Sequence, residues 1–484
     1  MKNINSILKI TTVALLTIFL TACGSSNSGT AKDAISAFLG QNENIIAFGN
    51  ADLKNVLSKA DYKNIPKLGK LLGGEFETLE KVIDFSIPLY YAVEGPLDLN
   101  GNPSATYAFI TVKDNEKFLA ELTTRGFDVN ETGDLSYSED GDFAIGVKNN
   151  IAIVVVQNKE FDAEKLMIAT FEKAESDLAG GKTDEILAQT GDLVLGMNVA
   201  SLYSTSNTEL EKLSTEKQKS LKELVKDSYI QTVVKFEDGA AIIETKNYFS
   251  DALKAKMFFN SDSKAPVLSK LGKGNARVGF SANIDMKKLQ ALIDEYSPET
   301  IDDLAGSLGG PAQFVMATAG SDLSKLFSGE FGVVMLGDLG DNGSMIPAFN
   351  VFLGLEKQGK ELGEMAAGMV PNVAESKVDG EGFKICSNSE NASKNGGLKI
   401  PAGCENFGKS GINAFVNLEG VNFDDFDLEG EANVIRVIKY ITFEYNNDGG
   451  RIYIKAKEGK ENILKQAMKV MVKELETEIN NIAI

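Results

Sequence analysis

Residues 44–54 read Asn-Ile-Ile-Ala-Phe-Gly-Asn-Ala-Asp-Leu-Lys, an apolar run that passes into a polar turn. The apolar part, 44–48, is typical of a buried strand. Asp52 comes next, and because aspartate is favoured at helix N-caps we expect a helix over Leu53–Ala60. The pairs Asn50/Asp52 and Asn283/Asp285 could also be polar sites at strand ends, but their position between a strand and a helix favours capping. The stretch therefore predicts a fold assembled from strands that lead into capped helices.

Hairpin signals join most of the other apolar runs. Asn100-Gly101 separates two strand-like runs, and further tight turns are expected at 139–141, 148–150 and 237–239. Asp114 and Asp162 are placed to cap two more helices. The expected buried face of the second of these helices comprises Leu166, Ala169, Thr170, Ala174 and Leu178. Short hairpin strands that alternate with helices predict an α+β fold with largely antiparallel sheets.

The order of these elements begins again after a polar stretch near Asn260. Asn-x-Asp-[Leu/Met]-Lys occurs at Asn50 and at Asn283, and Asn-Gly turns occur at Asn100 and at Asn342. Both halves close on Tyr-Ile, then Asp-Gly, then Leu-Lys with a Met shortly after, at 229–257 and 440–468. Three matches in one order predict a tandem duplication of one fold, with domains at 33–260 and 266–484.

The N-terminus has the parts of an export signal. Lys2 and Lys9 precede a short apolar segment, too short to span a bilayer comfortably, that ends in Leu20-Thr21-Ala22-Cys23. This ending resembles a bacterial lipobox, which implies a signal peptide at 1–22 and acylation of Cys23, as with palmitate. The alternative is an ordinary signal peptide with an incidental cysteine. Residues 23–32 are Gly/Ser-rich and predict a flexible tether between the lipid and the folded chain.

Charge and composition exclude several classes of function. The net charge is -20, and without the leader it is -22, which disfavours nucleic acid and anionic lipid head groups as partners. Membrane contact is therefore expected through the N-terminal lipid. The chain contains no His, which excludes Ser-His-Asp and Cys-His catalysis and imidazole zinc sites. It contains no Trp, which makes stacking on sugars or bases less favourable.

Two cysteines remain besides Cys23. Cys386 and Cys404 flank a Ser/Asn/Gly-rich loop, and in an exported protein they are expected to form a disulfide. The alternative is a pair of unbridged buried thiols.

No motif for catalysis, a metal or a cofactor stands out. The densest acidic cluster, 424–431, could bind calcium, but its spacing fits no calcium loop and favours a solvated loop. Asp98–Asn102 resembles the start of an EF-hand loop, but Pro103 stands where that loop needs Gly. The run 462–482 has helical apolar spacing and is expected to close the core rather than dock on a partner. We expect no catalytic residue, no metal and no cofactor.

The lipobox leader and the repeated strand, Asn-x-Asp and helix units resemble uncharacterised outer-membrane lipoprotein families of Bacteroidota-type bacteria. The resemblance implies a lipid-anchored protein of the cell envelope; no acid follows Cys23 directly, which implies the outer membrane. One expected function is a non-enzymatic lipoprotein that binds an envelope protein or a small ligand, or has a structural role. The other is a carboxylate-dependent hydrolase such as a glycosidase, which needs two acids at a set separation.

Overall fold

The computed structural model of the protein describes most of the chain after residue 30. The described residues are 31–64, 68–98, 100–157, 159–205, 214–260, 266–297, 319–337, 348–368, 370, 373–388, 397–409, 411–421, 423 and 430–482. The signal peptide, Cys23 and nearly all of the tether lie outside them, as do residues 424–429 of the acidic loop.

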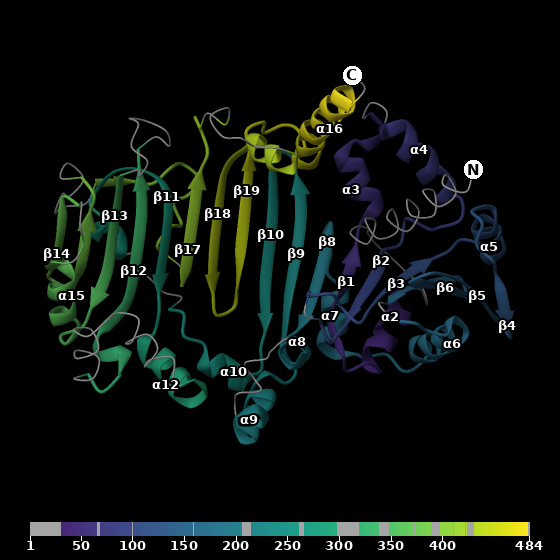
Figure 1. The fold of residues 1–484 in the computed structure, drawn as a ribbon, viewed down its shortest axis with the longest axis horizontal. Coiled ribbons are helices and arrows are strands. Elements are labelled where there is room, and N and C mark those ends of the chain that lie inside the picture. Colours follow the sequence, from purple (N-terminus) through teal and green to yellow (C-terminus); the bar gives the residue numbers. More distant parts are fainter. Residues whose placement is uncertain are drawn as a thin grey trace. The chain divides into compact units, whose positions relative to one another are not determined.

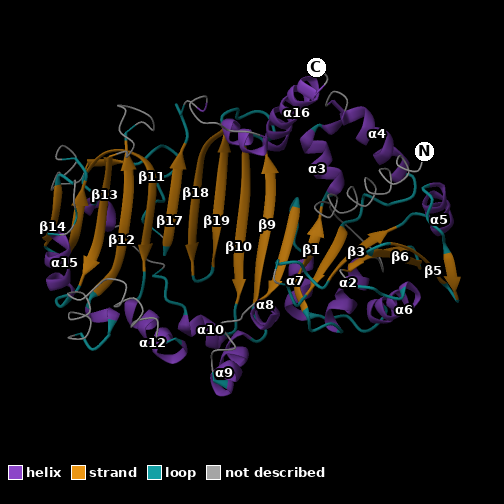
Figure 2. Ribbon diagram, in the orientation of Figure 1, coloured by secondary structure: helices purple, strands orange, loops and turns teal. Residues whose placement is uncertain are grey.

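The chain forms two compact units. The first unit comprises Met1–Ser214, Gln218–Phe249 and Glu458–Ile484, and the second comprises Thr215–Lys217 and Ser250–Lys457. Figure 1 follows the chain through both, and Figure 2 marks the strands and helices. Both units combine antiparallel sheet with helices, so the expected α+β class is confirmed.

The first unit is built on strands β1 to β10, accompanied by helices on both faces. Its strands are β1 (Ile45–Ala51), β2 (Leu89–Glu94), β3 (Ala105–Thr111), β4 (Asn130–Thr132), β5 (Leu135–Asp140), β6 (Phe143–Lys148), β7 (Ile151–Gln157), β8 (Leu193–Asn198), β9 (Tyr229–Glu237) and β10 (Ala240–Tyr248). Its helices are α2 (Ala31–Gly40), α3 (Leu53–Ala60), η1 (Tyr62–Asn64), α4 (Leu68–Leu79), α5 (Asn115–Thr124), α6 (Ala163–Ala174), α7 (Gly181–Leu187), α8 (Val199–Thr205), α9 (Thr215–Val225) and α16 (Ile463–Ile482).

The second unit is built on strands β11 to β19. Its strands are β11 (Lys273–Asn283), β12 (Phe327–Leu336), β13 (Ala348–Leu355), β14 (Glu375–Asp379), β15 (Gly382–Cys386), β16 (Gly397–Lys399), β17 (Ile412–Asn417), β18 (Ile438–Asn446) and β19 (Gly449–Ala456). Its helices are α10 (Asp251–Lys256), α11 (Pro266–Lys270), α12 (Met286–Tyr296), η3 (Leu323–Lys325), α15 (Gly359–Ala367) and η7 (Gly430–Val437).

The two sheets have the same order of strands. In the first unit the pairings run β6-β7-β3-β2-β1-β8-β9-β10, with β5 and β4 added beyond β6. In the second they run β14-β15-β13-β12-β11-β17-β18-β19. The first strand of each unit thus lies at the same place, between the second strand and the strand that precedes the final hairpin. This shared order agrees with a duplicated fold, but the duplication of the sequence stays a prediction.

Helices and turns begin where the sequence predicts them. The carboxylates of Asp52, Asp114, Asp162 and Asp285 each accept a backbone N–H in the first turn of the helix that follows. Tight hairpins join β5 to β6, β6 to β7 and β9 to β10 at the expected turns. Asn149 and Asn150 both have positive φ, the geometry that a two-residue type I′ turn requires.

The buried face of α6 differs from the one expected. Met167, Phe171 and Ala174 pack into the core with Thr170, whereas Leu178 lies beyond the helix and is 56% exposed. Large side chains at 167 and 171 fill the space under the sheet, so the face is rotated relative to the predicted one.

Two apolar clusters cover opposite faces of the first sheet. On one face α2 packs through Ile35 and Phe38 against Tyr107 and Phe109 of β3. On the other face Leu53 of α3 and Phe76 of α4 belong to the cluster that contains Ala108 and Ile110 of the same strand. Because successive residues of a strand point to opposite faces, β3 serves both cores.

The division of the chain differs from the expected domains at both of their edges. The units separate at Phe249/Ser250 rather than near residue 260, so α10 belongs to the second unit. The final segment was expected in the second domain, yet Glu458–Ile484 belongs to the first. Met468 and Val472 of α16 pack on the cluster that contains Leu53, so the described part of this helix contributes to the core of the first unit.

Candidate functional site

The two cysteines expected to pair are free thiols in the structure, and both are buried. Cys386 ends β15, opposite Asn350 and Glu375, while Cys404 packs with Phe407 and Phe415. Burial raises the pKa of the Cys404 thiol to about 11 and also raises that of Cys386. The structure thus shows the two cysteines as thiols in separate packing environments. The disulfide expected from the sequence stays a prediction.

Two acidic segments were candidates for a metal site, 424–431 and Asp98–Asn102. No group of Asp, Glu or Cys side chains within the described residues is arranged to hold a metal ion. Residues 424–429 of the acidic cluster lie outside that part of the chain. The Asp98 carboxylate accepts the backbone N–H groups of Asn100 and Asn102, each at 2.8 Å, so it shapes a turn.

The pair of carboxylates most relevant to a hydrolase is Asp52 and Asp192 in the first unit. Asp192 is 1% exposed and accepts from Lys59 Nζ and Asn55 Nδ2, both at 2.7 Å, and from a backbone N–H. Burial raises the pKa of Asp52. The hydrogen bond that its carboxylate accepts from the backbone N–H of Asn55 lowers the pKa by less than burial raises it. Both acids are therefore occupied in tying α3 to the strand β8, and neither lines the apolar pocket described next.

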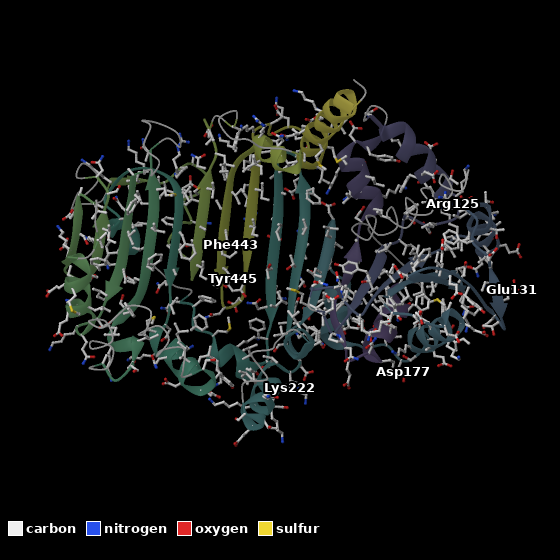
Figure 3. All side chains as sticks on the ribbon, in the orientation of Figure 1. Arg125, Glu131, Asp177, Lys222, Phe443 and Tyr445 are labelled. Carbon is white, nitrogen blue, oxygen red and sulfur yellow. The ribbon has the colours of Figure 1, made fainter. Side chains whose placement is uncertain are left out.

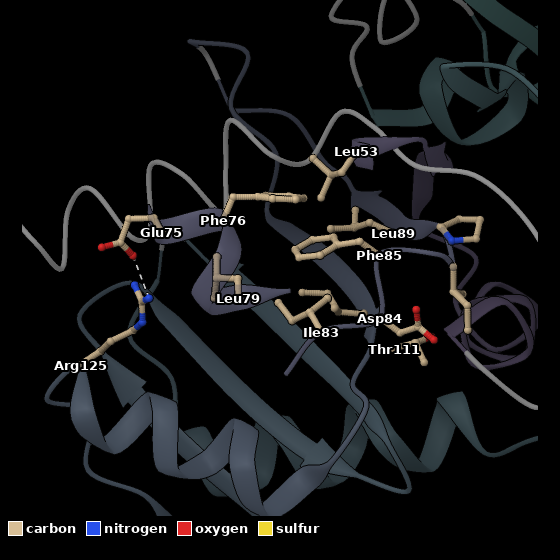
Figure 4. A pocket seen from close by; sticks show the side chains of 13 residues that line it. Leu53, Glu75, Phe76, Leu79, Ile83, Asp84, Phe85, Leu89, Thr111 and Arg125 are labelled. Carbon is tan, nitrogen blue, oxygen red and sulfur yellow. Dashed lines mark hydrogen bonds and ion pairs between the residues drawn. The ribbon is translucent and has the colours of Figure 1, made fainter. Parts of the chain in front are cut away.

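An apolar pocket lies in the first unit, between the sheet and the segment 75–89 (Figure 4). Its apolar lining comprises Leu53, Phe76, Leu79, Ile83, Phe85, Ile87, Pro88, Leu89 and Ile110. Phe76 and Phe85 stack with their ring centroids 4.5 Å apart and form part of the wall. The cavity has a volume of about 50 Å³. A single water needs roughly 10–15 Å³ on such a measure, so the pocket exceeds what one water requires.

The charged groups beside this pocket are already neutralised. Arg125 donates to Glu75 at 2.8 Å and to Glu121 at 2.7 Å, and Figure 4 shows the first of these contacts. Burial alone would lower the pKa of Arg125, but these two carboxylates raise it. Burial would raise the pKa of Asp84, yet hydrogen bonds from the Ser86 hydroxyl and amide lower it. The pocket therefore suits an uncharged apolar group.

The second unit presents an apolar sheet face that we call the open face. It is defined by three rows of residues that are direct partners on neighbouring strands. The middle row is Ile385, Val351, Val333, Phe280, Ala414, Phe443 and Ile452. One flanking row is Phe383, Leu353, Phe331, Ala282, Ile412, Tyr445 and Gly450. The other is Phe349, Met335, Val278, Val416, Ile441 and Ile454.

The open face is less buried than the opposite face of the same sheet. Phe280 is 38% exposed, and all other residues of the middle row are partly exposed. On the opposite face Val334 and Phe352 are 0% exposed, because α11 and the segment around Phe407 cover them. Phe443 and Tyr445, labelled on β18 in Figure 3, stack with their ring centroids 6.4 Å apart. The sheet thus leaves apolar side chains partly in water on one side.

The pocket and the open face lie on equivalent faces of the two sheets. Ala51 is the last residue of β1 paired with β8, and Asp52 N then donates to Asp192 O at 2.9 Å. Ala282 is the corresponding residue of β11, followed by a 2.7 Å bond from Asn283 N to Gly411 O. Leu89 faces Ala51 and Phe331 faces Ala282, so a pocket residue and an open-face residue occupy the same position.

Sequence reasoning found neither apolar site. The alternation of apolar and polar residues that marks a half-exposed strand is absent from residues 331–336 of β12 and from β13, where Asn350 is the one polar side chain. Such a run predicts a strand buried on both faces, so the sequence does not predict the partly exposed face of these strands. The pocket depends on how residues 75–89 return over the sheet, for which a sequence carries no direct signal.

Within the described residues, every helix is either too short or too polar to cross a membrane. No protein-family model matches the chain, and no curated protein matches it. Three crystal forms of TP0453 are similar in structure. Form III has a TM-score of 0.29 at 8% identity over 48% of this chain and 86% of that one. Form I has 0.28 at 8% over 46% and 82%, and form IV 0.28 at 10% over 44% and 79%. At these values the likeness carries no argument about fold or function.

Proposed function

We propose that this protein is a lipid-anchored lipoprotein of the cell envelope, held in the outer membrane through Cys23. We further propose that it is not an enzyme and that it binds a small apolar ligand in the pocket of the first unit. The observation that carries the binding role is the pocket itself, whose walls are apolar and whose neighbouring charges are paired. The leader and its lipobox-like Leu20-Thr21-Ala22-Cys23 support the location.

The absence of tryptophan from the chain makes the binding role directly testable. An Ile87→Trp variant places a single fluorophore at the pocket, on a partly exposed position where the larger ring need not disturb the core. A Leu178→Trp variant places it on an exposed residue of the same unit as a matched control.

We expect 1-butanol, a small uncharged alkyl ligand, to shift the emission of Ile87→Trp to the blue in a saturable titration. The Leu178→Trp emission should not change over the same concentrations. Equal responses of the two variants, or no response of Ile87→Trp, would show that the pocket does not bind alkyl chains.

Lipid anchoring has its own experiment. Cys23→Ala should abolish labelling by a clickable fatty acid and release the protein from membranes, because acylation is the proposed anchor. Label retained on the Cys23→Ala protein would overturn the anchor while leaving the pocket proposal standing.

A further inference from the structure

We propose that the open face of the second unit binds the hydrocarbon chains of an uncharged or zwitterionic amphiphile, taken up as a single molecule. The proposal concerns a different site from the pocket of the first unit and does not depend on it.

The chemistry of the open face fits hydrocarbon. Its middle row contains no charged or hydrogen-bonding side chain, and Phe280 at its centre is 38% exposed. With strands about 4.8 Å apart, the three rows span roughly 30 Å by 14 Å of sheet, or about 400 Å². Ala282 and Phe383 are buried and the remaining residues other than Phe280 are partly exposed, so only part of this span is in contact with water. Apolar side chains gathered in water on one face of a protein are often functional, because leaving them there costs free energy.

On the first unit, helices and loops cover the sheet face that is equivalent to the open face. Leu89, at the position of Phe331, lies under Phe76 and Phe85, and all three are buried. In the second unit α15 covers one end of the face, where Gly363 lies close to Val378 and Leu355. Among the described residues, Val333, Phe280 and Phe443 remain partly exposed, so this part of the face can take an apolar occupant.

A second copy of the chain fits the open face poorly. Each mature chain carries a net charge of -22, and the middle row offers no basic side chain to offset the repulsion between copies. The roughly 400 Å² spanned on each copy is also about half of the 800 Å² that each partner contributes to a standard interface.

A bilayer surface fits it poorly as well. Glu356 and Asp448 are exposed and follow the strand ends next to the row that contains Phe331, while Glu381 at the same edge is paired with Lys270 at 2.8 Å. This acidic rim would meet the head groups before the apolar face did, and it would be repelled by anionic lipid. A single amphiphile avoids this contact, since its chains can lie on the sheet while its head group stays at the rim.

The test uses the mature protein with Phe280→Trp as its only tryptophan and a brominated dodecyl maltoside, whose bromine quenches indole on contact. We expect saturable quenching below the critical micelle concentration. Thr442→Trp places the fluorophore on the opposite face of β18, which is separated from β11 by β17, and should not be quenched. Adding Ala414→Asp beside Phe280 should weaken the quenching at least tenfold, because it buries a charge beneath the chains.

Thermal melts of Ala414→Asp establish that the variant folds, and Ile87→Trp carrying Ala414→Asp reports the pocket of the first unit separately. An unchanged Ile87→Trp response with loss of Phe280→Trp quenching supports the open face as an independent site. Equal quenching of Phe280→Trp and Thr442→Trp would overturn the proposal. Quenching only by brominated phosphatidylcholine vesicles, or a concentration-dependent dimer that Ala414→Asp dissociates, would replace it with bilayer docking or self-association.

Discussion

Burial controls the chemistry of the two cysteines more than their spacing does. With a pKa raised to about 11, only about one Cys404 thiol in a thousand is ionised near pH 8, and the thiolate is the reactive form. We expect the native protein to react only slowly with a thiol reagent. Denaturation without reductant then separates the two readings: two titratable thiols for the free state, and none for the disulfide. Rapid reaction in the native state would contradict the burial.

The partly buried carboxylate of Asp52 makes the free energy of unfolding depend on pH. Burial raises its pKa in the folded state above the ordinary value of an aspartate, so the folded protein binds this proton more tightly than the unfolded chain. The associated stability is present below the unfolded pKa and is lost as pH rises through the folded pKa.

Asp52→Asn removes the titration and keeps a good N-cap. The free energy of unfolding of the variant, relative to the parent, should therefore increase between about pH 4 and about pH 7 in urea titrations. If the difference in free energy of unfolding between variant and parent is constant across this range, burial does not raise the pKa of Asp52. Asp114→Asn serves as a control, because Asp114 is an exposed cap whose pKa is lowered by Lys117.

At the scale of single elements, caps and turns were the most predictable part. Asp52 and Asp285 begin helices because a side-chain carboxylate satisfies N–H groups that the helix leaves unpaired, a local interaction that needs only nearby residues. Because a capping residue is selected by its near neighbours, a matching Asn-x-Asp motif is weak evidence that two segments are duplicated copies. The strand ladders align Asp52 with Asn283, two residues before the Asp285 that the sequence pattern matches to it.

The packing of α16 could not be predicted from interactions between residues close in the chain. Asn462 Nδ2 donates to Phe236 O at 3.1 Å, Gly239 N donates to Glu461 O at 2.8 Å, and Lys465 pairs with Asp61 at 2.9 Å. These partners lie more than 200 residues earlier in the chain. The final segment thereby covers the β9–β10 turn and α3 of the first unit.

Val472→Asp should test this placement. A charge in place of a side chain that is 9% exposed should lower the free energy of unfolding by about 2–3 kcal/mol and increase hydrogen exchange in α3. Exchange in β11 and β12 of the second unit should be unchanged. Lys473→Arg, at the adjacent exposed position, keeps the charge and should alter stability by no more than about 0.5 kcal/mol. Faster exchange in β11 rather than α3 would contradict the assignment of α16 to the first unit.

At the scale of the whole molecule, the two units differ in continuity. The second unit is almost entirely the single segment Ser250–Lys457, whereas the first needs Glu458–Ile484 in addition to the residues before 250. We expect the fragment 250–457 to unfold cooperatively by itself, because its core is contained within it. The fragment 31–249 should be less stable and should gain stability when the peptide 458–484 is added. No effect of that peptide would show that the first unit is complete without it.

Interactions between residues close in the chain made three features predictable: the α+β class, the helix starts at Asp52, Asp114, Asp162 and Asp285, and the hairpin turns. Long-range packing set which core the last helix joins, which face of α6 is buried, and where Cys386 and Cys404 lie. It also decided that equivalent apolar faces are covered in the first unit and partly open in the second. An apolar strand carries the same pattern whether or not another segment packs on it, so only the packing of distant segments distinguishes a core from a binding surface.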